Sequence, residues 1–288
     1  MFYSTLRSTI CQLSVDSILR CARMDTRRSL MGIRLLISDI DGTLVHKDIR
    51  VDGSTIACGN TRAVATGTVA RLQALQASHI PVVLVTGRRT KNYRILANII
   101  PHGLAILEHG GIILHADGSR DVEWHSLLAP WVGSPPSRSG TLWDFEAVLR
   151  AEGFLTDSEE RDTSFRIHPP PSGSVPDNDA YQALRQRELP VGLTMLWTYG
   201  ATLECFPTAS GKRNAVNFML KRLGVNIQDV AMIGDDSNDM DLLTAVGYPC
   251  TLASAIAEVV TLVQGRGGFV ARSGGHEGIQ EILTYLAS

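Results

Sequence analysis

Two carboxylates follow an apolar run near the beginning of the chain. The segment 35–44 reads LLISDIDGTL, where Leu35 to Asp39 predict a buried strand ending in a carboxylate and Asp41 follows before Gly42. Open α/β sheets bind their ligands at the carboxyl ends of their strands. Two carboxylates crowded at such a place are costly unless a cation or a reaction uses them. A strand followed by an ordinary turn is the alternative interpretation, because Asp-Gly is a common turn pair.

Three later segments place further polar groups at a strand end or a helix start. They are VTGR at 85–88, Lys212 near the start of a predicted helix, and GDDSND at 234–239. The carboxyl ends of parallel strands lie along one edge of a sheet, so residues far apart in the sequence can meet there. Carboxylates, one hydroxyl and one lysine suit a hard cation together with a phosphate, and Asp39 and Asp235 are the natural ligands of Mg²⁺.

Each of these residues also has an ordinary interpretation when it is taken alone. Thr86 could cap the following helix, Lys212 could be a solvated lysine in the first turn of a helix, and Asp235 could be an N-cap. Thr86, Gly87 and Arg88 together offer a hydroxyl, a flexible residue and a cation, which suit an anion. The joint occurrence of all the groups favours a phosphate and metal site.

The four segments resemble the four motifs of the haloacid dehalogenase superfamily. DIDGTL at 39–44 looks like the first motif, VTGR at 85–88 is similar to the second, Lys212 to the third, and GDDSND at 234–239 to the fourth. Order and spacing match over about residues 33–288. The long insertion between the second and third motifs resembles the α/β cap of the Cof-type and sucrose- or mannosylglycerate-phosphate phosphatase branch.

The resemblance implies a covalent mechanism. Asp39 would attack phosphorus and form an aspartyl-phosphate, while Asp41 would protonate the leaving alcohol and then deprotonate the hydrolytic water. A dehalogenase would not need the second aspartate, so Asp41 favours phosphate chemistry. Mg²⁺ would be bound by Asp39, the backbone carbonyl of Asp41, and Asp235, and Lys212 would stabilise the charge that develops during transfer.

The resemblance also implies roles for the surrounding residues. Thr86, Gly87, Gly42 and Asn238 would bind the phosphoryl oxygens. Asp239, and with it Asn238, would orient Lys212, the metal-bound waters or the phosphate.

The periodicity between the motifs predicts how they are positioned. Strands alternate with helices before and after the middle of the chain, which predicts a parallel sheet with crossover helices. The predicted elements are strands at 35–39, 81–85, 104–107, 112–114, 229–233, 251–252 and 268–271, a hairpin within 45–60, and helices at 61–79, 91–100, 211–223, 238–246, 255–263 and 276–286. The fold class is α/β: a doubly wound, Rossmann-like parallel-sheet core at 33–115 and 207–288, with an inserted α+β cap at 116–206.

The predicted cap mixes helices with short antiparallel strands and two loops. Its predicted elements are loops at 129–140 and 168–179, helices at 143–151 and 181–187, a strand at 164–168, and a hairpin of 193–199 with 202–206. Three of its residues, Arg161, Arg166 and His168, are candidates to face the substrate, although surface charge is the favoured interpretation of each.

The composition of the chain argues against nucleic acid and membrane as partners and indicates a cellular compartment. A formal net charge of −2 gives no general attraction to nucleic acid, and no apolar run reaches the length of about 20 residues that spans a membrane. The five cysteines form no CxxC pair, which favours a reducing compartment and thus the cytoplasm. Residues 1–32 are rich in Arg and Ser and poor in acids, so import into a mitochondrion or plastid is the alternative, as are a disordered extension and a later start of translation.

The sequence therefore predicts a Mg²⁺-dependent phosphatase that hydrolyses a small phosphomonoester, with a sugar phosphate as the expected substrate. It is expected to act as a monomer or homodimer, without nucleic acid or membrane. A phosphotransferase or phosphomutase of the same superfamily is the first alternative, because the role of Asp41 is shared. A non-catalytic regulatory protein is the second, and it predicts the loss of at least one of Asp39, Asp41, Lys212 and Asp235, all of which are present.

Overall fold

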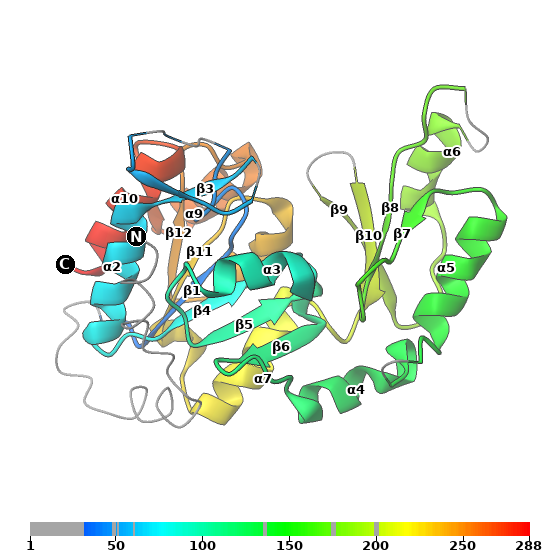
Figure 1. Cartoon of the computed structure of the whole chain (residues 1–288), viewed down its shortest axis with the longest axis horizontal. Coiled ribbons are helices and arrows are strands. Elements are labelled where there is room, and N and C mark those ends of the chain that lie inside the picture. The colour runs from blue at the N-terminus through cyan, green and yellow to red at the C-terminus, as the bar shows by residue number, and fades with distance from the viewer. Residues whose placement is uncertain are drawn as a thin grey trace, which may run out of the picture.

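The chain folds into a larger and a smaller body, each built on its own sheet (Figure 1). The structure is a computed structural model that describes residues 32–47, 50, 52–59, 61–134, 137–173, 177–198 and 202–288. The predicted extension at 1–32 therefore lies outside the described residues, apart from its last one. No helix of the described ranges is both long and apolar enough to cross a membrane.

The larger body contains a seven-stranded sheet in the order β13-β12-β11-β1-β4-β5-β6. Its strands are β1 (Leu35–Ser38), β4 (Val82–Val85), β5 (Leu104–Leu107), β6 (Ile112–His115), β11 (Val230–Ile233), β12 (Tyr248–Thr251) and β13 (Phe269–Val270). Neighbouring strands from β13 to β5 are parallel, and β6 runs antiparallel to β5. Every residue of β1, β4, β5 and β11 is buried, as expected for strands covered on both faces.

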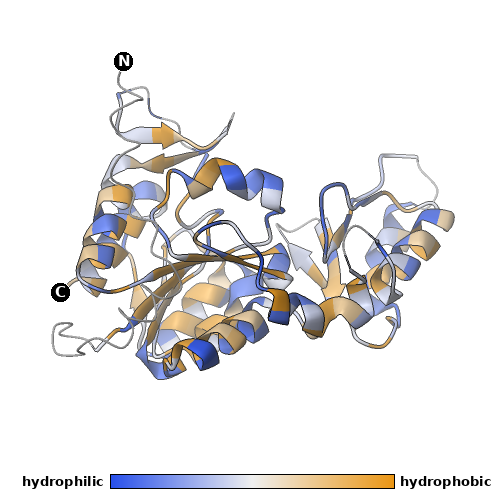
Figure 2. Ribbon diagram, turned by 60° about the horizontal axis from the view of Figure 1, so that its bottom comes forward, coloured by the Kyte–Doolittle hydropathy of each residue, from blue (hydrophilic) through white to orange (hydrophobic). Residues whose placement is uncertain are grey.

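Helices cover both faces of this sheet, which confirms the doubly wound prediction. They are α2 (Thr66–Ala77), α3 (Thr90–Ala97), α7 (Lys212–Leu223), α8 (Met240–Ala245), α9 (Ala257–Gly265) and α10 (Gly275–Leu286). Alternate residues of β1 point to opposite faces: Leu35 and Ile37 pack in one apolar cluster with α7, α8 and α9, and Leu36 packs in the other with α2, α3 and α10. Figure 2 shows the resulting pattern, with hydrophobic residues on the strands and both kinds of residue on the covering helices.

The smaller body contains a four-stranded antiparallel sheet in the order β7-β8-β10-β9. Its elements are α4 (Val122–Val132), α5 (Thr141–Ala151), β7 (Thr156–Asp157), β8 (Phe165–Ile167), α6 (Asn178–Ala183), β9 (Leu193–Thr198) and β10 (Thr202–Pro207). Figure 1 shows α5 and α6 on the side of this sheet that is remote from the larger body. The other side of the sheet is therefore turned toward the larger body. The cap boundaries at 116–206 remain a prediction.

Two kinds of short segment lie between these elements. A hairpin of β2 (Thr55–Ala57) and β3 (Ala63–Ala65) follows the first motif. Single 3-10 turns occur at η2 (Glu108–Gly110), between β5 and β6, at η3 (Leu184–Gln186), at η4 (Ile227–Asp229) and at η5 (Ser237–Asp239), after β11.

Four predicted elements differ from the structure. The loop expected to begin at residue 129 is helical as far as Val132, because Trp124, Leu128 and Val132 form a buried stripe that continues past Pro130. The helix expected from residue 61 begins at Thr66, since the residues before it pair with β2. The strand expected at 251–252 covers 248–251, and the helix expected at 238–246 is divided into η5 and α8.

Candidate active site

Lys212 lies at the centre of a buried polar cluster at the carboxyl edge of the larger sheet. It is the first residue of α7 and is only 4% exposed, so the alternative of a solvated lysine is wrong. Its Nζ donates to Oδ1 of Asp39 at 2.6 Å, to Oδ1 of Asp239 at 2.7 Å and to Oδ1 of Asn238 at 3.1 Å. Because an ammonium group has three N–H donors, these contacts use all of them.

Three carboxylates converge on this cluster. One oxygen each of Asp39, Asp235 and Asp239 lies within 4.8 Å of the others. Asp39 follows β1, and the other two follow β11, its parallel neighbour, so adjacent strands bring the first and fourth motifs together. Oδ1 of Asp235 accepts a hydrogen bond from Thr43 Oγ1 at 2.8 Å.

Asp239 already uses both of its carboxylate oxygens. Oδ1 accepts from Lys212, and Oδ2 accepts from the backbone N–H groups of Asp235 at 3.1 Å and Asp236 at 3.4 Å. This arrangement suits a residue that orients its neighbours. In contrast, no hydrogen bond from the described part of the chain reaches Oδ2 of Asp39.

The cluster holds more negative charge than Lys212 can balance. Burial raises the pKa of Asp39 well above its usual range; Lys212 lowers it, and Asp239 and Asp235 raise it again. Burial and Asp239 raise the pKa of Asp235 to about 7. Burial lowers the pKa of Lys212, but the neighbouring Asp239 and Asp39 raise it by more, so the net shift of this pKa is upward. Closely spaced carboxylates in excess over cations are a set of oxygen donors that fits Mg²⁺.

Gly42 is required by the close approach of the first and fourth motifs. Its φ is +85°, and a Cβ atom at this position would lie 2.0 Å from Oδ2 of Asp235. Any larger residue would displace that carboxylate and strain the backbone. The glycine of the first motif thus allows Asp235 to lie against the turn that carries Asp41.

Asp41 is held by two arginines and is 7% exposed. Arg88 donates from Nε to Oδ2 and from Nη2 to Oδ1, both at 2.6 Å, which is a bidentate contact. Arg62, just before β3, donates from Nη1 to Oδ1 at 2.7 Å. The sequence marked Arg88 as a cation at a strand end, but it gave no sign of Arg62, which occurs singly in a hairpin.

Thr86 and Gly87 lie at the end of β4, which pairs with β1. Thr86 is buried, and its Oγ1 accepts from the backbone N–H of Arg88 at 3.2 Å. Because α3 begins only at Thr90, this contact closes a local turn rather than capping the helix. The expected phosphate contacts of Thr86, Gly87, Gly42 and Asn238 remain predictions.

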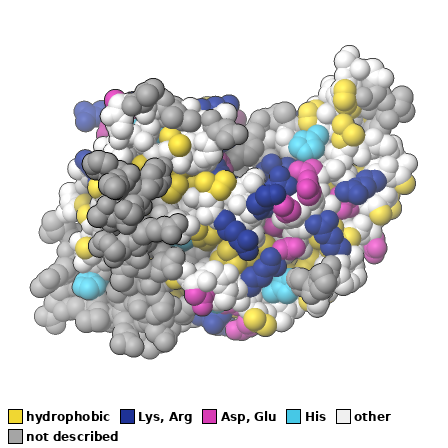
Figure 3. Space-filling view, viewed as in Figure 1, with side chains coloured by type: hydrophobic (Ala, Val, Ile, Leu, Met, Phe, Trp, Pro, Cys, Tyr) yellow, Lys and Arg dark blue, Asp and Glu magenta, His cyan; other side chains and the backbone are white. Residues whose placement is uncertain are grey.

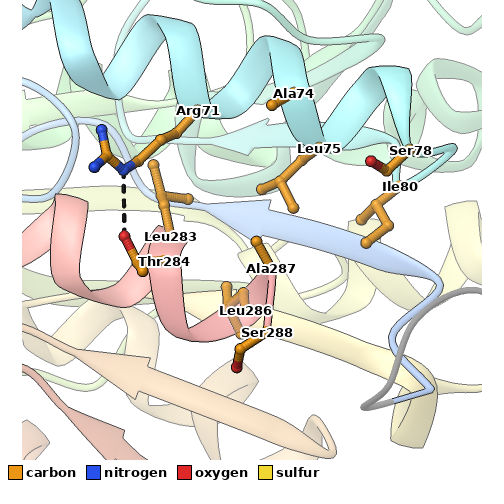
Figure 4. A pocket seen from close by; sticks show the side chains of 10 residues that line it. All are labelled: Arg71, Ala74, Leu75, Ser78, Ile80, Leu283, Thr284, Leu286, Ala287 and Ser288. Atoms are coloured by element: carbon orange, nitrogen blue, oxygen red, sulfur yellow. Dashed lines mark hydrogen bonds between the residues drawn. The ribbon is translucent and has the colours of Figure 1, made fainter.

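A pocket of about 390 Å³ opens beside these groups and includes Asp41, Arg62, Asp235 and Asp236 in its lining. This volume suits a small ligand. A second pocket, of about 570 Å³, lies between α2 and α10 and shares no lining residue with the cluster. Figure 4 shows its mostly apolar wall and the contact of Arg71 Nε with Thr284 Oγ1 at 3.3 Å.

The smaller body approaches the fourth motif directly. Ser237 Oγ donates to the backbone carbonyl of Trp197 in β9 at 3.4 Å. In Figure 3, charged side chains gather where the smaller body meets the larger one. Of the three candidate cap residues, Arg161 is 2% exposed, so surface charge was the wrong interpretation of it, whereas Arg166 and His168 are partly exposed.

Comparison with known proteins supports the resemblance that the motifs indicated. A sequence model of haloacid dehalogenase-like hydrolases matches residues 174–273. A haloacid dehalogenase-like hydrolase from B. subtilis superposes with a TM-score of 0.62 at 15% identity, covering 88% of this chain and 100% of that one. Residues 174–273 are therefore similar in sequence to haloacid dehalogenase-like hydrolases, and the chain shares the fold of the B. subtilis protein. The resemblance stated from the four motifs is thereby confirmed.

Two kinds of phosphatase also match over most of the chain. The sucrose-phosphatase from Synechocystis, solved with sucrose and phosphate, superposes with a TM-score of 0.61 at 17% identity, covering 88% of this chain and 97% of that one. The phosphoglycolate phosphatase of Archaeoglobus fulgidus is 25% identical over 253 residues, which is 86% of this chain and 94% of the relative. The phosphoglycolate phosphatase of Methanothermobacter thermautotrophicus is 20% identical over 251 residues, 87% of this chain and 97% of the relative.

Proposed function

We propose that this protein is a Mg²⁺-dependent phosphatase that hydrolyses a small phosphomonoester through an aspartyl-phosphate on Asp39. The observation that carries the proposal is the buried contact of Lys212 with Asp39 and Asp239, beside an Asp235 carboxylate that no cation of the described residues balances. The names of the phosphoglycolate phosphatases and of the sucrose-phosphatase support phosphate-ester hydrolysis as the reaction.

In the first step, Asp39 displaces the alcohol from phosphorus. Lys212 engages Oδ1 of Asp39 and leaves Oδ2 for attack. As the bond from Oδ2 to phosphorus forms, the bond from phosphorus to the ester oxygen breaks, and Asp41 gives its proton to that oxygen. Lys212 stabilises the charge that accumulates on the carboxylate and the phosphoryl group.

In the second step, water releases the phosphate. Asp41, now ionised, takes a proton from a water molecule, whose oxygen attacks phosphorus while the bond to Asp39 breaks. Mg²⁺ would be held by Asp39, Asp235 and the backbone carbonyl of Asp41, and when bound it supplies positive charge to the phosphoryl oxygens. Thr43 would orient Asp235 as a ligand, and Asp239 would orient Lys212.

Arg62 and Arg88, the two arginines that contact Asp41, indicate which class of substrate the site favours. Asp41 must carry a proton before it can act as an acid. A protonated Asp41 no longer neutralises the positive charges of Arg62 and Arg88, which can then attract an anionic group of the substrate. This favours an alcohol that carries its own carboxylate or phosphate, as the name of the phosphoglycolate phosphatases suggests. A sugar phosphate, the substrate class expected from the sequence, is the second candidate, and the name of the sucrose-phosphatase supports it.

Phosphate release with Mg²⁺ and with EDTA tests the proposal. The panel would contain 2-phosphoglycolate, hexose phosphates, nucleoside monophosphates and a phosphosugar with its bisphosphate activator. We expect metal-dependent release of inorganic phosphate that is lost in Asp39→Asn and kept in Asp241→Asn, a matched change of an exposed carboxylate. Isomerised phosphosugar without free phosphate would instead identify a phosphomutase, and an Asp39→Asn variant with full activity would exclude the covalent mechanism.

The cellular setting is also a proposal. We place the protein in the cytoplasm, and Cys58, Cys205 and Cys250 are free and buried, as expected under reducing conditions. The carboxylates and Lys212 come from one chain, which is compatible with the expected monomer or homodimer.

A further inference from the structure

The turn between β5 and β6 connects the smaller body to residues 86–88, the proposed phosphate-binding segment. Glu108 and His109 have φ values of 49° and 54°, so two successive residues with side chains adopt the left-handed conformation. Such a conformation is sparsely populated outside glycine and persists when the surroundings hold it. The side chains of Glu108 and His109 show what holds it, because both are inserted between the two bodies.

Glu108 binds the loop before β8. Its side chain is fully buried, and Oε2 accepts from the backbone N–H of Thr163 at 2.8 Å and from Thr163 Oγ1 at 2.9 Å. The backbone N–H of Asp162 adds a contact at 3.1 Å. The turn is also packed closely here, because a Cβ atom on Gly111 would lie 1.8 Å from Thr163 Oγ1.

His109 binds the open face of the smaller sheet. Its Nε2 lies 2.7 Å from Oε2 of Glu204 in β10, and its ring stacks on Phe206 with centroids 5.4 Å apart. An ionised carboxylate only accepts hydrogen bonds, so Nε2 carries the proton. Arg166 binds Oε1 of Glu204 at 2.6 Å, and Arg161 lies 3.4 Å from Oε2.

The opposite side of the same turn contacts the second and third motifs. A Cβ atom on Gly87 would lie 2.4 Å from Nε2 of His109, so the imidazole rests directly on this glycine. The backbone N–H of His109 donates to the carbonyl of Thr86 at 3.1 Å. A Cβ atom on Gly110 would lie 2.2 Å from the carbonyl oxygen of Gly211, the residue before Lys212.

We propose that His109 and Glu204 are positioning residues that couple the docking of the smaller body to the geometry of the Thr86–Arg88 segment. With Glu204 in place, the imidazole is fixed between Phe206 and Gly87, and the turn holds Thr86 and Gly87 against β4. When the smaller body moves away, Nε2 of His109 loses its acceptor and the left-handed turn loses the contacts that hold it. The phosphate-binding segment is then ordered only in the docked state, so phosphoryl transfer is restricted to the closed site.

This inference rests on the proposed phosphatase function for its kinetic readout but not for its structural one. The variants are His109→Ala, His109→Gln, Glu204→Gln and the double variant His109→Ala/Glu204→Gln. Lys91→Met is the matched control, since Lys91 Nζ also joins the two bodies, to Glu160 Oε1 at 2.6 Å, but belongs to exposed α3 surface away from Gly87. The probes are p-nitrophenyl phosphate as substrate and inorganic phosphate as inhibitor. Amide hydrogen exchange of residues 82–89 is measured in all variants without substrate.

We expect His109→Ala to lower kcat/KM about tenfold to a hundredfold, as small misplacements of reacting groups do. It should weaken inhibition by phosphate and speed hydrogen exchange at 86–88. His109→Gln, whose amide can still donate to Glu204, should recover part of each change. The double variant should lose little more than the worse single variant, because both changes break one contact. Lys91→Met should behave as the wild type.

Other results would overturn the proposal. It fails if folded His109→Ala and Glu204→Gln keep wild-type exchange at 86–88, or if their effects on kcat/KM simply add. If His109→Ala does not fold, hydrogen exchange at 86–88 in Glu204→Gln, a substitution that preserves the shape of the side chain, decides the test. If the wild type hydrolyses no ester, the proposed function is lost, yet faster exchange at 86–88 in Glu204→Gln but not in Lys91→Met still supports the coupling.

Discussion

Two groups of buried charges in this chain differ in how their charges balance. The first, for which we propose catalysis and which is called the catalytic cluster below, places Asp39, Asp235 and Asp239 around one ammonium, that of Lys212. The junction cluster, made of Glu204, His109, Arg161 and Arg166, places one carboxylate among an imidazole and two guanidinium groups. Both are largely removed from water, so their own partners decide whether the charges are stabilised.

The pKa shifts of the two clusters run in opposite directions. Burial raises the pKa of Asp39 and of Asp235, and Lys212 does not compensate fully. Burial also raises the pKa of Glu204, but His109, Arg161 and Arg166 lower it by more, and the net shift is downward. The carboxylate of the junction cluster is thus balanced within the chain, whereas the catalytic cluster keeps an excess of negative charge that the proposed Mg²⁺ would balance. A buried carboxylate that its neighbours leave unbalanced is therefore a candidate for a site of chemistry.

We expect the largest effect from Asp39→Asn, which changes the charge balance of the catalytic cluster. We expect a loss of kcat of at least about 10³-fold, because the nucleophile is removed. We also expect the metal-free variant to be more stable than the wild type at pH 8. The pKa of folded Asp39 lies above its unfolded value, so the free energy of unfolding falls as the pH rises above the unfolded value, and Asn, which does not ionise, avoids this loss.

Urea unfolding at pH 8 in EDTA would measure the expected gain in stability, and phosphate release in Mg²⁺ would measure the expected loss of kcat. Asp241→Asn provides the matched control, because that carboxylate is exposed. A metal-free Asp39→Asn variant that is less stable than the wild type would contradict the imbalance inferred for the catalytic cluster.

Glu204→Gln should have the opposite effect on stability. We expect a loss of about 3 kcal/mol in the free energy of unfolding at pH 7, since two guanidinium groups lose their buried counter-ion. The pKa of folded Glu204 lies below its ordinary value of 4.5, so its contribution is present above that pH and declines as the pH falls.

The measurement is the difference in unfolding free energy between wild type and Glu204→Gln at pH 7 and at pH 3.5. The difference should shrink at the lower pH. Glu258→Gln, a change of an exposed glutamate, serves as control. A difference that grows on acidification would show that Glu204 is not held as an anion.

Mg²⁺ should act on one cluster only. At a hundredfold excess over its dissociation constant it should stabilise the protein by about 2.7 kcal/mol. This gain should be lost in Asp235→Asn, which removes a ligand, and retained in Glu204→Gln. Thermal unfolding with and without Mg²⁺ in the three proteins would measure it, and an equal gain in Asp235→Asn would place the ion elsewhere.

Thr43→Val should give the smallest effect. The hydroxyl of Thr43 orients Asp235 at 2.8 Å, so its loss should weaken Mg²⁺ about tenfold, as loss of a partner of a metal ligand commonly does. The Mg²⁺ dependence of kcat/KM would report the change. Thr68→Val is the control for removing a buried hydroxyl away from the site. An unchanged Mg²⁺ requirement would mean that Thr43 supports the fold only.

The sequence predicted the elements whose signals are local. The apolar run before Asp39 and the glycines Gly42, Gly87 and Gly234 mark where the chain turns after three strands, and the order of strands and helices implies the doubly wound sheet. The prediction was wrong where burial outweighed a local signal. Pro130 marked a loop, yet α4 continues to Val132, and Arg161 was taken for surface charge although it is buried against Glu204.

The sequence alone predicted Asp39, Asp41, Lys212 and Asp235 as the residues that carry the chemistry, because each stands at a strand end or helix start that a parallel sheet brings to one edge. Only the tertiary structure decided what holds them. The contact of Thr43 with Asp235 joins positions 192 apart, and that of His109 with Glu204 joins positions 95 apart. Such pairs leave no periodic trace, since a side-chain contact depends on where two elements pack and not on the spacing of residues within either.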